Sequence, residues 1–249
     1  ASDVYKRQVS DPKKISWSRG LKSSLAKNKS INHRQDCLAP VVYRPYTRQW
    51  LYYDRILNEM VLQMPKLFPK AESKNRLIVI KNRWSGEGQL ALMVDSLIEQ
   101  QTDGGTQCFP RYIYGGNVSD AEQGNLLGQL NATDQNEQQD GITDEGLAHF
   151  QTFYPGETIS KDDLFYYTYG LLHSPDYRER YVENLSKELP RIPAVKGIES
   201  FRAFIEAGRK LGDLHIGYEN VEPYPVAIAQ GDLRLAHICL LYKSYAADE

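Results

Sequence analysis

Four long cations on one short stretch of the chain are the residues best suited to chemistry. They are Arg178, Arg180, Lys187 and Arg191. Cations on an ordered helix or in a stiff loop can hold an anion with little further loss of entropy, because the backbone is already fixed. Acidic residues alternate with them: Glu179, Glu183 and Glu188. Such alternation is also typical of a solvated helix face, so both interpretations stay open.

Local signals predict the helix that would carry these cations. Ser174 can cap a helix and Pro175 suits its first turn, whereas Pro190 and Pro193 prevent its continuation. Apolar residues recur every three or four positions, which predicts one buried face. They are Tyr177, Tyr181, Val182 and Leu185.

The sequence gives only weak signals for a catalytic or metal-binding site. His173 precedes the cap of that helix, which favours a structural hydrogen-bonding role. His237 and Cys239 share one face of an expected strand, but no further zinc ligand follows at a matching spacing. The sequence also lacks a P-loop, a G-x-S-x-G motif and the N-P-P-[YF] motif of adenine methyl transfer. We therefore expect neither a catalytic residue nor a metal site.

Composition and charge set broad limits on the class of protein. The three cysteines lie far apart without a C-x-x-C motif, which favours a reducing compartment, and no run of 18 apolar residues occurs. We expect a soluble cytoplasmic protein without a membrane partner. The net charge is −2, yet nine basic and three acidic residues fall within 1–36, and seven acidic residues and no basic ones within 119–145. Local patches rather than the total decide contact with nucleic acid, so charge permits it without requiring it.

The hydrophobic pattern predicts an α+β fold: antiparallel strands, then a group of about four helices, then terminal strands. The expected strands span 76–81, 90–98 and 107–114, and Pro110 should confine the third to an edge or a bulge. A long loop is expected over 115–142. The helices should cover 143–152, a stretch from Ser160, the cation-bearing stretch, and 197–213. Two final strands should join around Gly231–Asp232.

The N-terminal third is expected to be less regular. Residues 13–36 are predicted to form a basic helix followed by a polar segment. Residues 41–69 are predicted to form a largely extended segment with a short helix near 54–62. Within that extended segment, Arg44 and Arg48 alternate with Tyr46 and Trp50.

Three blocks of sequence together resemble a known family. They are YRPYTRQWLYYDRILNEMVLQMPKLFP at 43–69, GGTQCFPRYIY at 104–114, and ISKDDLFYYTYGLLHSPDYRERYVENLSKELPRIP at 159–193. This combination resembles the C-terminal specificity domain of Type ISP restriction-modification enzymes. Those are single-chain proteins with nuclease, helicase-like ATPase, N6-adenine methyltransferase and target-recognition parts. The resemblance implies a target-recognition domain over 37–249 and the tail of the preceding methyltransferase domain over 1–36.

The resemblance also implies a function and partners. The chain would recognise double-stranded DNA sequence in a phage-defence system and be non-catalytic in isolation. It would adjoin the upstream methyltransferase domain of the same polypeptide. S-adenosylmethionine, ATP and Mg would be needed only by the upstream domains, so no cofactor is expected in this chain. Two alternatives stay open: a fragment of a related single-chain adenine methyltransferase that retains activity, and a protein-interaction scaffold without DNA contact.

Candidate DNA contacts follow from the same resemblance. Cations supply affinity through phosphates, and polar side chains in the major groove read bases. The candidates are Arg44, Tyr46, Arg48, Arg111, Tyr112, Arg178, Arg180, Lys187 and Arg191. Arg111 stands where the family pattern has an apolar residue. The aromatics Trp50, Tyr52 and Tyr53 could instead attach the domain to the methyltransferase.

Overall fold

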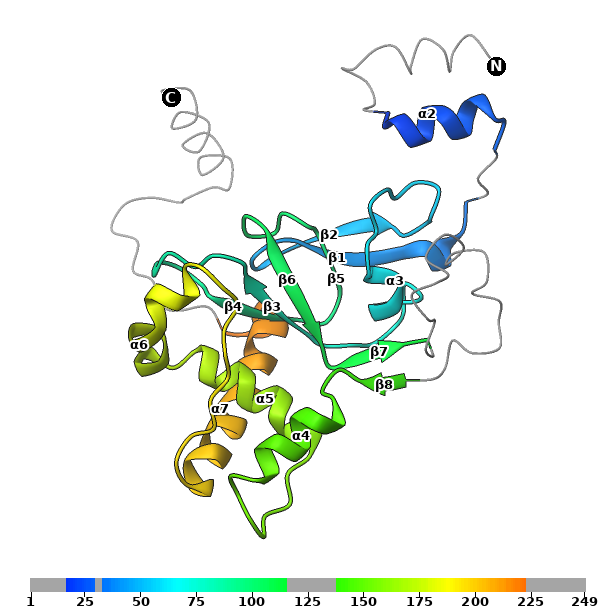
Figure 1. Ribbon diagram of the computed structural model, residues 1–249. Coiled ribbons are helices and arrows are strands. Elements are labelled where there is room, and N and C mark those ends of the chain that lie inside the picture. The colour runs from blue at the N-terminus through cyan, green and yellow to red at the C-terminus, as the bar shows by residue number, and fades with distance from the viewer. Residues whose placement is uncertain (1–16, 30–32, 116–137, 223–249) are drawn as a thin grey trace, which may run out of the picture. The chain divides into compact units, whose positions relative to one another are not determined.

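The computed structural model describes residues 17–29, 33–115 and 138–222 (Figure 1). The described residues up to Tyr218 form one compact unit, and those from Glu219 onward belong to a second. The fold is α+β, with strands first and the main helices after them. No helix in the described part of the chain is long and apolar enough to cross a membrane.

Eight strands form three small sheets. The first has the order β2-β1-β5, the second β4-β3-β6, and the third pairs β7 with β8. All pairings are antiparallel except that of β1 with β5, which is parallel. The strands are β1 (Leu38–Arg44), β2 (Thr47–Tyr52), β3 (Leu77–Lys81), β4 (Ala91–Val94), β5 (Leu97–Ile98), β6 (Thr106–Pro110), β7 (Tyr112–Tyr114) and β8 (Gln138–Asp140).

The second sheet separates two hydrophobic cores. Side chains alternate along a strand, so Ile78 and its partner Met93 face one side while Val79 and its partner Leu92 face the other. The first pair packs into the core that the helices cover, and the second into the core shared with the first sheet. Such burial on both faces explains the unbroken apolar run of β3.

Six α-helices are described, and α4 to α7 lie on the helical side of the second sheet (Figure 1). They are α2 (Arg19–Ala26), α3 (Met64–Leu67), α4 (Asp144–Gln151), α5 (Lys161–Leu172), α6 (Pro175–Leu185) and α7 (Ile198–Ile216). Helices α5 and α7 cross at Gly170 and Gly208. A Cβ at Gly170 would lie 2.3 Å from the Phe204 carbonyl oxygen, so only glycine permits this backbone contact.

The helix boundaries confirm the capping signals. Ser160 caps α5 in a capping box with Asp163, and Ser174 caps α6 with Pro175 in its first turn. Pro110 lies in β6, an edge strand, as its missing N–H requires.

Several expected elements differ from the structure. No helix forms near 54–62; the short helix is α3, ten residues later, because Pro65 suits a first helical turn. The second expected strand divides into β4 and β5, and the third into β6 and β7 around Arg111. Part of the expected 115–142 loop is a strand, β8, which pairs with β7. The terminal strands around Gly231–Asp232 lie outside the described residues, as do His237 and Cys239.

Candidate nucleic-acid interface

The Arg178 side chain packs against the end of α5 and Trp84 and does not extend into solvent. Its Nε donates to the Leu172 carbonyl oxygen at 2.8 Å, which satisfies the C-terminal end of α5. Its Nη2 lies 3.0 Å from His173 Nδ1, and its guanidinium lies over the Trp84 ring at 5.7 Å. Burial lowers the pKa of Arg178 from its ordinary value. The alternation with acidic residues is typical of a solvated helix face, and the spacing of the apolar residues leaves Arg178 off the buried face; the structure instead shows Arg178 half-buried.

A buried group of rings adjoins Arg178. His173 and His215 lie with ring centroids 5.4 Å apart, and Tyr169 hydrogen-bonds to His215 while accepting from the Met93 N–H. Burial, with the Arg178 cation, lowers the pKa of His173 to about 3. His173 is therefore a neutral structural group, as expected from sequence.

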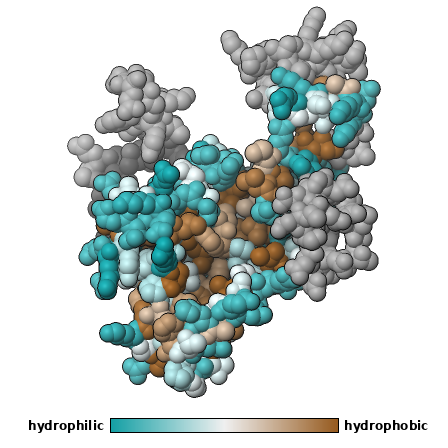
Figure 2. Space-filling view, in the orientation of Figure 1, coloured by the Kyte–Doolittle hydropathy of each residue, from teal (hydrophilic) through white to brown (hydrophobic). Residues whose placement is uncertain are grey.

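The other three cations of this stretch point to solvent. Lys187 pairs with Glu183 at 3.7 Å and Arg191 with Glu188 at 3.2 Å, both exposed. Arg180 lies over the Tyr181 ring at 5.7 Å. Figure 2 shows a hydrophilic surface over α6. Exposed ion pairs contribute little stability, so an arriving phosphate can replace the carboxylates at small cost.

The loop after α6 is fixed by its backbone. The Tyr177 hydroxyl donates to the Arg191 carbonyl oxygen at 2.8 Å, and the Tyr167 hydroxyl donates to that of Pro193 at 2.5 Å. The Arg191 side chain is nevertheless 86% exposed. Because the backbone is fixed, an exposed cation at this position loses little entropy when it binds an anion.

Arg83 joins this surface, although the sequence analysis did not single it out. It is exposed in the turn between β3 and β4, and the N–H of the next residue, Trp84, donates to the Leu185 carbonyl oxygen at 3.0 Å. That bond places the turn beside the C-terminal end of α6. No local sequence signal reveals this, because the contact spans about a hundred residues.

The β1–β2 hairpin carries three further candidates. Arg44 forms an ion pair with Glu99 at 3.0 Å and lies over the Tyr43 ring at 4.0 Å. Arg48 is more enclosed: its Nη2 donates to Asp95 at 3.1 Å and to the carbonyl oxygen of Ile216 at 2.8 Å.

Tyr46 forms the tip of the same hairpin, with a left-handed φ of 55°. Its ring meets those of His215 and Tyr218 edge-on at 5.5 and 5.4 Å. The hairpin is therefore joined to the end of α7.

Arg111 and Tyr112 lie where β6 passes into β7. The guanidinium of Arg111 reaches Asp162 of α5 and lies over the Tyr112 ring at 4.8 Å. The backbone N–H of Tyr112 donates to the side chain of Asn75 at 3.1 Å. Both residues are half-buried, and Arg111 is ion-paired within the fold.

The nine candidates thus divide among three places in the fold: the α6 stretch, the hairpin and the β6–β7 junction. In the described ranges, no group of three or more His, Cys, Asp or Glu side chains could hold a metal ion.

Comparison with known families decides which group of proteins these features belong to. The family model described as the Type ISP C-terminal specificity domain matches residues 1–243. The chain belongs to this family. Comparison with curated proteins finds no match.

Three solved structures resemble this specificity domain, each at 31% sequence identity. The ATP-dependent Type ISP restriction-modification enzyme LlaBIII bound to DNA has a TM-score of 0.67 over 91% of this chain and 14% of its own. The DrdV–DNA complex has a TM-score of 0.72 over 96% of this chain and 22% of its own. A nuclease-deletion mutant of the Type ISP enzyme LlaGI, in complex with a DNA substrate mimic, has a TM-score of 0.62 over 91% and 15%. The specificity domain spans less than a quarter of each relative.

Proposed function

We propose that this chain recognises the DNA sequence for a longer Type ISP restriction-modification polypeptide and has no catalytic activity of its own. Family membership carries the proposal, supported by the DNA present in all three matched structures. Residues 1–36 are the tail of an upstream adenine methyltransferase domain, and 37–249 are the target-recognition domain. S-adenosylmethionine, ATP and Mg belong to the upstream domains, and the polypeptide acts in the cytoplasm.

The phosphate-binding surface that we favour is the outer face of α6 with its exit loop. Arg180, Lys187 and Arg191 are exposed there, and Arg83 lies beside them. The carboxylates that pair with Lys187 and Arg191, those of Glu183 and Glu188, are themselves exposed, so these ion pairs are weak. Arg191 is the strongest single candidate because its backbone is fixed by Tyr177 while its side chain is exposed and paired only weakly, through an exposed ion pair with Glu188.

The remaining candidates take different parts in this proposal. Arg44 is exposed at the end of β1 and can reach a strand of DNA from the hairpin. Tyr46 and Arg48 orient that hairpin against α7 through their ring and hydrogen-bond contacts. Arg111, Tyr112 and Arg178 stabilise the fold, because each is already engaged inside it.

The salt dependence of DNA binding tests this assignment. Affinity of the chain for a duplex should fall steeply with salt, and Arg191→Ala should lower the magnitude of the log–log salt slope by about one unit at every duplex sequence. Arg202→Ala is the matched control, since Arg202 is also an exposed arginine paired with a glutamate, on α7. Fluorescence anisotropy at four salt concentrations gives both slopes. Binding of the wild-type chain without salt dependence, or no binding at low salt, would defeat the proposal.

Catalytic inactivity needs a separate measurement. The purified chain should neither bind S-adenosylmethionine in a calorimetric titration nor transfer a methyl group to DNA. Methyl transfer that a point substitution within the chain abolishes would favour the alternative of a methyltransferase fragment.

A further inference from the structure

Exposed apolar side chains concentrate in one part of the domain. Among the described residues, seven of the eleven large hydrophobic side chains that are exposed fall within 38–62. Trp50 on β2 is 77% exposed, and Met60 and Leu62 in the following loop are 73% and 61% exposed. Single exposed apolar residues are normal on a protein surface, so their concentration in one stretch of the chain indicates an interaction surface.

The loop holds two of these side chains outward at a cost in backbone energy. Met60 and Leu62 both adopt left-handed backbone angles, with φ of 55° and 49°. Such angles are unfavourable for large side chains, by about 1–3 kcal/mol per residue. The outward position of two apolar side chains is therefore built into the loop and indicates a contact outside the described fold.

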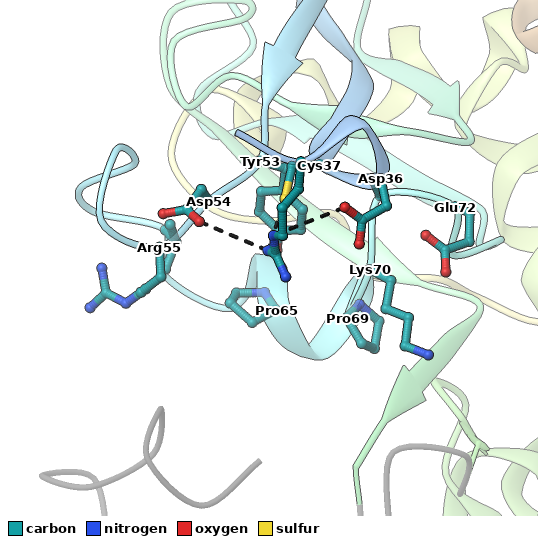
Figure 3. Close-up of a pocket in the computed structure, with 12 residues that line it drawn as sticks. Asp36, Cys37, Tyr53, Asp54, Arg55, Pro65, Pro69, Lys70 and Glu72 are labelled. Atoms are coloured by element: carbon teal, nitrogen blue, oxygen red, sulfur yellow. Dashed lines mark hydrogen bonds and ion pairs between the residues drawn. The ribbon is translucent and has the colours of Figure 1, made fainter. Parts of the chain in front are cut away.

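A groove of about 320 Å³ adjoins this loop (Figure 3). Val61, between Met60 and Leu62, lines it together with apolar atoms of Tyr53 and Cys37. The Tyr53 hydroxyl donates to the Phe68 carbonyl oxygen at 3.0 Å, which fixes one wall. We call the groove and the exposed residues Trp50, Met60 and Leu62 the apolar face.

The charges around the groove are balanced. Three cations and three carboxylates line it: Arg34, Arg55, Lys70, Asp36, Asp54 and Glu72. Arg34 lies 4.0 Å from Asp36 and 3.9 Å from Asp54 (Figure 3). A DNA-binding surface needs an excess of positive charge, whereas an apolar centre with a rim of mixed charge is the usual form of a protein–protein interface.

The chain that enters the domain runs past the same loop. Ser18, which caps α2, donates from its hydroxyl to Glu59 Oε1 at 2.7 Å, so the segment ahead of the sheet meets the loop. Each matched relative is more than four times longer than the part this chain covers, and the family is a C-terminal domain. A domain that precedes this one would therefore be joined to the described residues through a segment that contacts this loop.

We infer that the apolar face docks the domain that precedes this one in the full polypeptide, through an apolar patch on that domain. The inference rests on the proposed position of the chain within a longer polypeptide, but not on its proposed DNA contacts. Docking here would bury Trp50, Met60 and Leu62 and leave the α6 surface free for DNA.

Hydroxyl-radical footprinting of the 249-residue chain and of the full polypeptide tests the inference. Met60 and Trp50 should be oxidised about fivefold more slowly in the full polypeptide, as burial in an interface excludes solvent. Phe153, which is 52% exposed near α4, is the internal control and should react equally in both. Equal oxidation of Met60 in both proteins would overturn the inference. Protection of the isolated chain by duplex DNA alone would also overturn it, because the face would then contact DNA.

A variant separates docking from DNA binding. The double substitution Met60→Ser, Leu62→Ser in the full polypeptide should speed tryptic cleavage after Lys27 and Lys29 about fivefold, because undocking exposes the connecting segment. Phe153→Ser is the matched control and should leave the rate unchanged. Cleavage at the wild-type rate in the double variant would contradict docking. Protection of Met60 in a polypeptide that fails to bind DNA would uphold docking while defeating the proposed DNA contacts.

Discussion

The Nε atom of Arg111 lies 2.6 Å from Asp162 Oδ1. The other oxygen of Asp162 lies 2.7 Å from Arg209 of α7, and Arg209 lies over the ring of Tyr166 at 4.2 Å. Arg76 completes the group, because its Nη1 donates to the Tyr166 hydroxyl at 2.8 Å. These charges connect the β6–β7 junction with α5 and α7, and all of them are partly shielded from water.

A double-mutant cycle on Arg111 and Asp162 should show coupling of about 1 kcal/mol in the free energy of unfolding. The pair is half-buried, so its coupling should exceed that of an exposed pair. Urea denaturation of the two single variants and the double variant gives the value. The exposed pair Lys187 and Glu183 provides the control cycle. Coupling near zero at Arg111, with weakened DNA binding, would instead return this residue to the DNA surface.

Replacement of Arg178 and of Arg180 should affect stability very unequally, although the two residues are only two positions apart on α6. Arg178→Ala leaves the Leu172 carbonyl oxygen without its donor and should lower stability by about 2 kcal/mol. Arg180→Ala removes an exposed side chain and should change stability by less than about 0.5 kcal/mol. Thermal unfolding measures both. An unchanged melting temperature for Arg178→Ala would disprove its structural role.

Stability should fall as the pH drops below 6.5, because of His173. Its pKa in the fold is about 3, lowered by burial and by the Arg178 cation, so the unfolded chain binds the proton more readily. The stabilising contribution is complete above pH 6.5 and is lost progressively toward pH 3; at pH 5 the loss is about 2 kcal/mol. Urea unfolding at pH 7 and pH 5 should show this loss in the wild-type chain and a smaller one in His173→Gln. Identical losses in both proteins would rule out His173 as the source.

Glycine-to-alanine substitutions should separate the helix crossing from ordinary helix positions. Gly170→Ala places a Cβ 2.3 Å from the Phe204 carbonyl oxygen and should destabilise the chain by more than about 2 kcal/mol, despite the better helix propensity of alanine. Gly146→Ala in α4 is the control, since its nearest neighbour would be a side-chain oxygen at 3.4 Å. It should stabilise the chain by up to about 1 kcal/mol. Equal effects at both sites, in thermal unfolding, would show that α5 and α7 can move apart.

Features that depend on neighbouring residues could be predicted from the sequence. The capping box of Ser160 and Asp163 is an example, because its two hydrogen bonds join residues three apart. The cap at Ser174 is another. The α+β order of elements follows from hydrophobic period alone and is confirmed. The family was identified from three motifs in a fixed order, which the family match confirms.

Features that depend on distant residues could not be predicted in this way. Outward and inward cations look alike in a helical pattern, so the burial of Arg178 became clear only with Trp84 and the end of α5 in place. Strand β8 lacks an apolar pattern, because all three of its residues are exposed and, among the described strands, it pairs with β7 alone. Arg83 reaches the α6 surface through tertiary contact alone. Which candidate residues touch DNA stays a prediction.

The glycine crossing of α5 and α7 also constrains how specificity domains can be recombined. A side chain on either helix at that point would clash with the backbone of the other, so the close packing of the two helices requires glycine on both. A chimera that takes α5 from one parent and α7 from another inherits this fit only if both parents keep glycine at positions 170 and 208. The span 161–216 is therefore a single unit of exchange, and junctions intended to alter DNA specificity belong outside it.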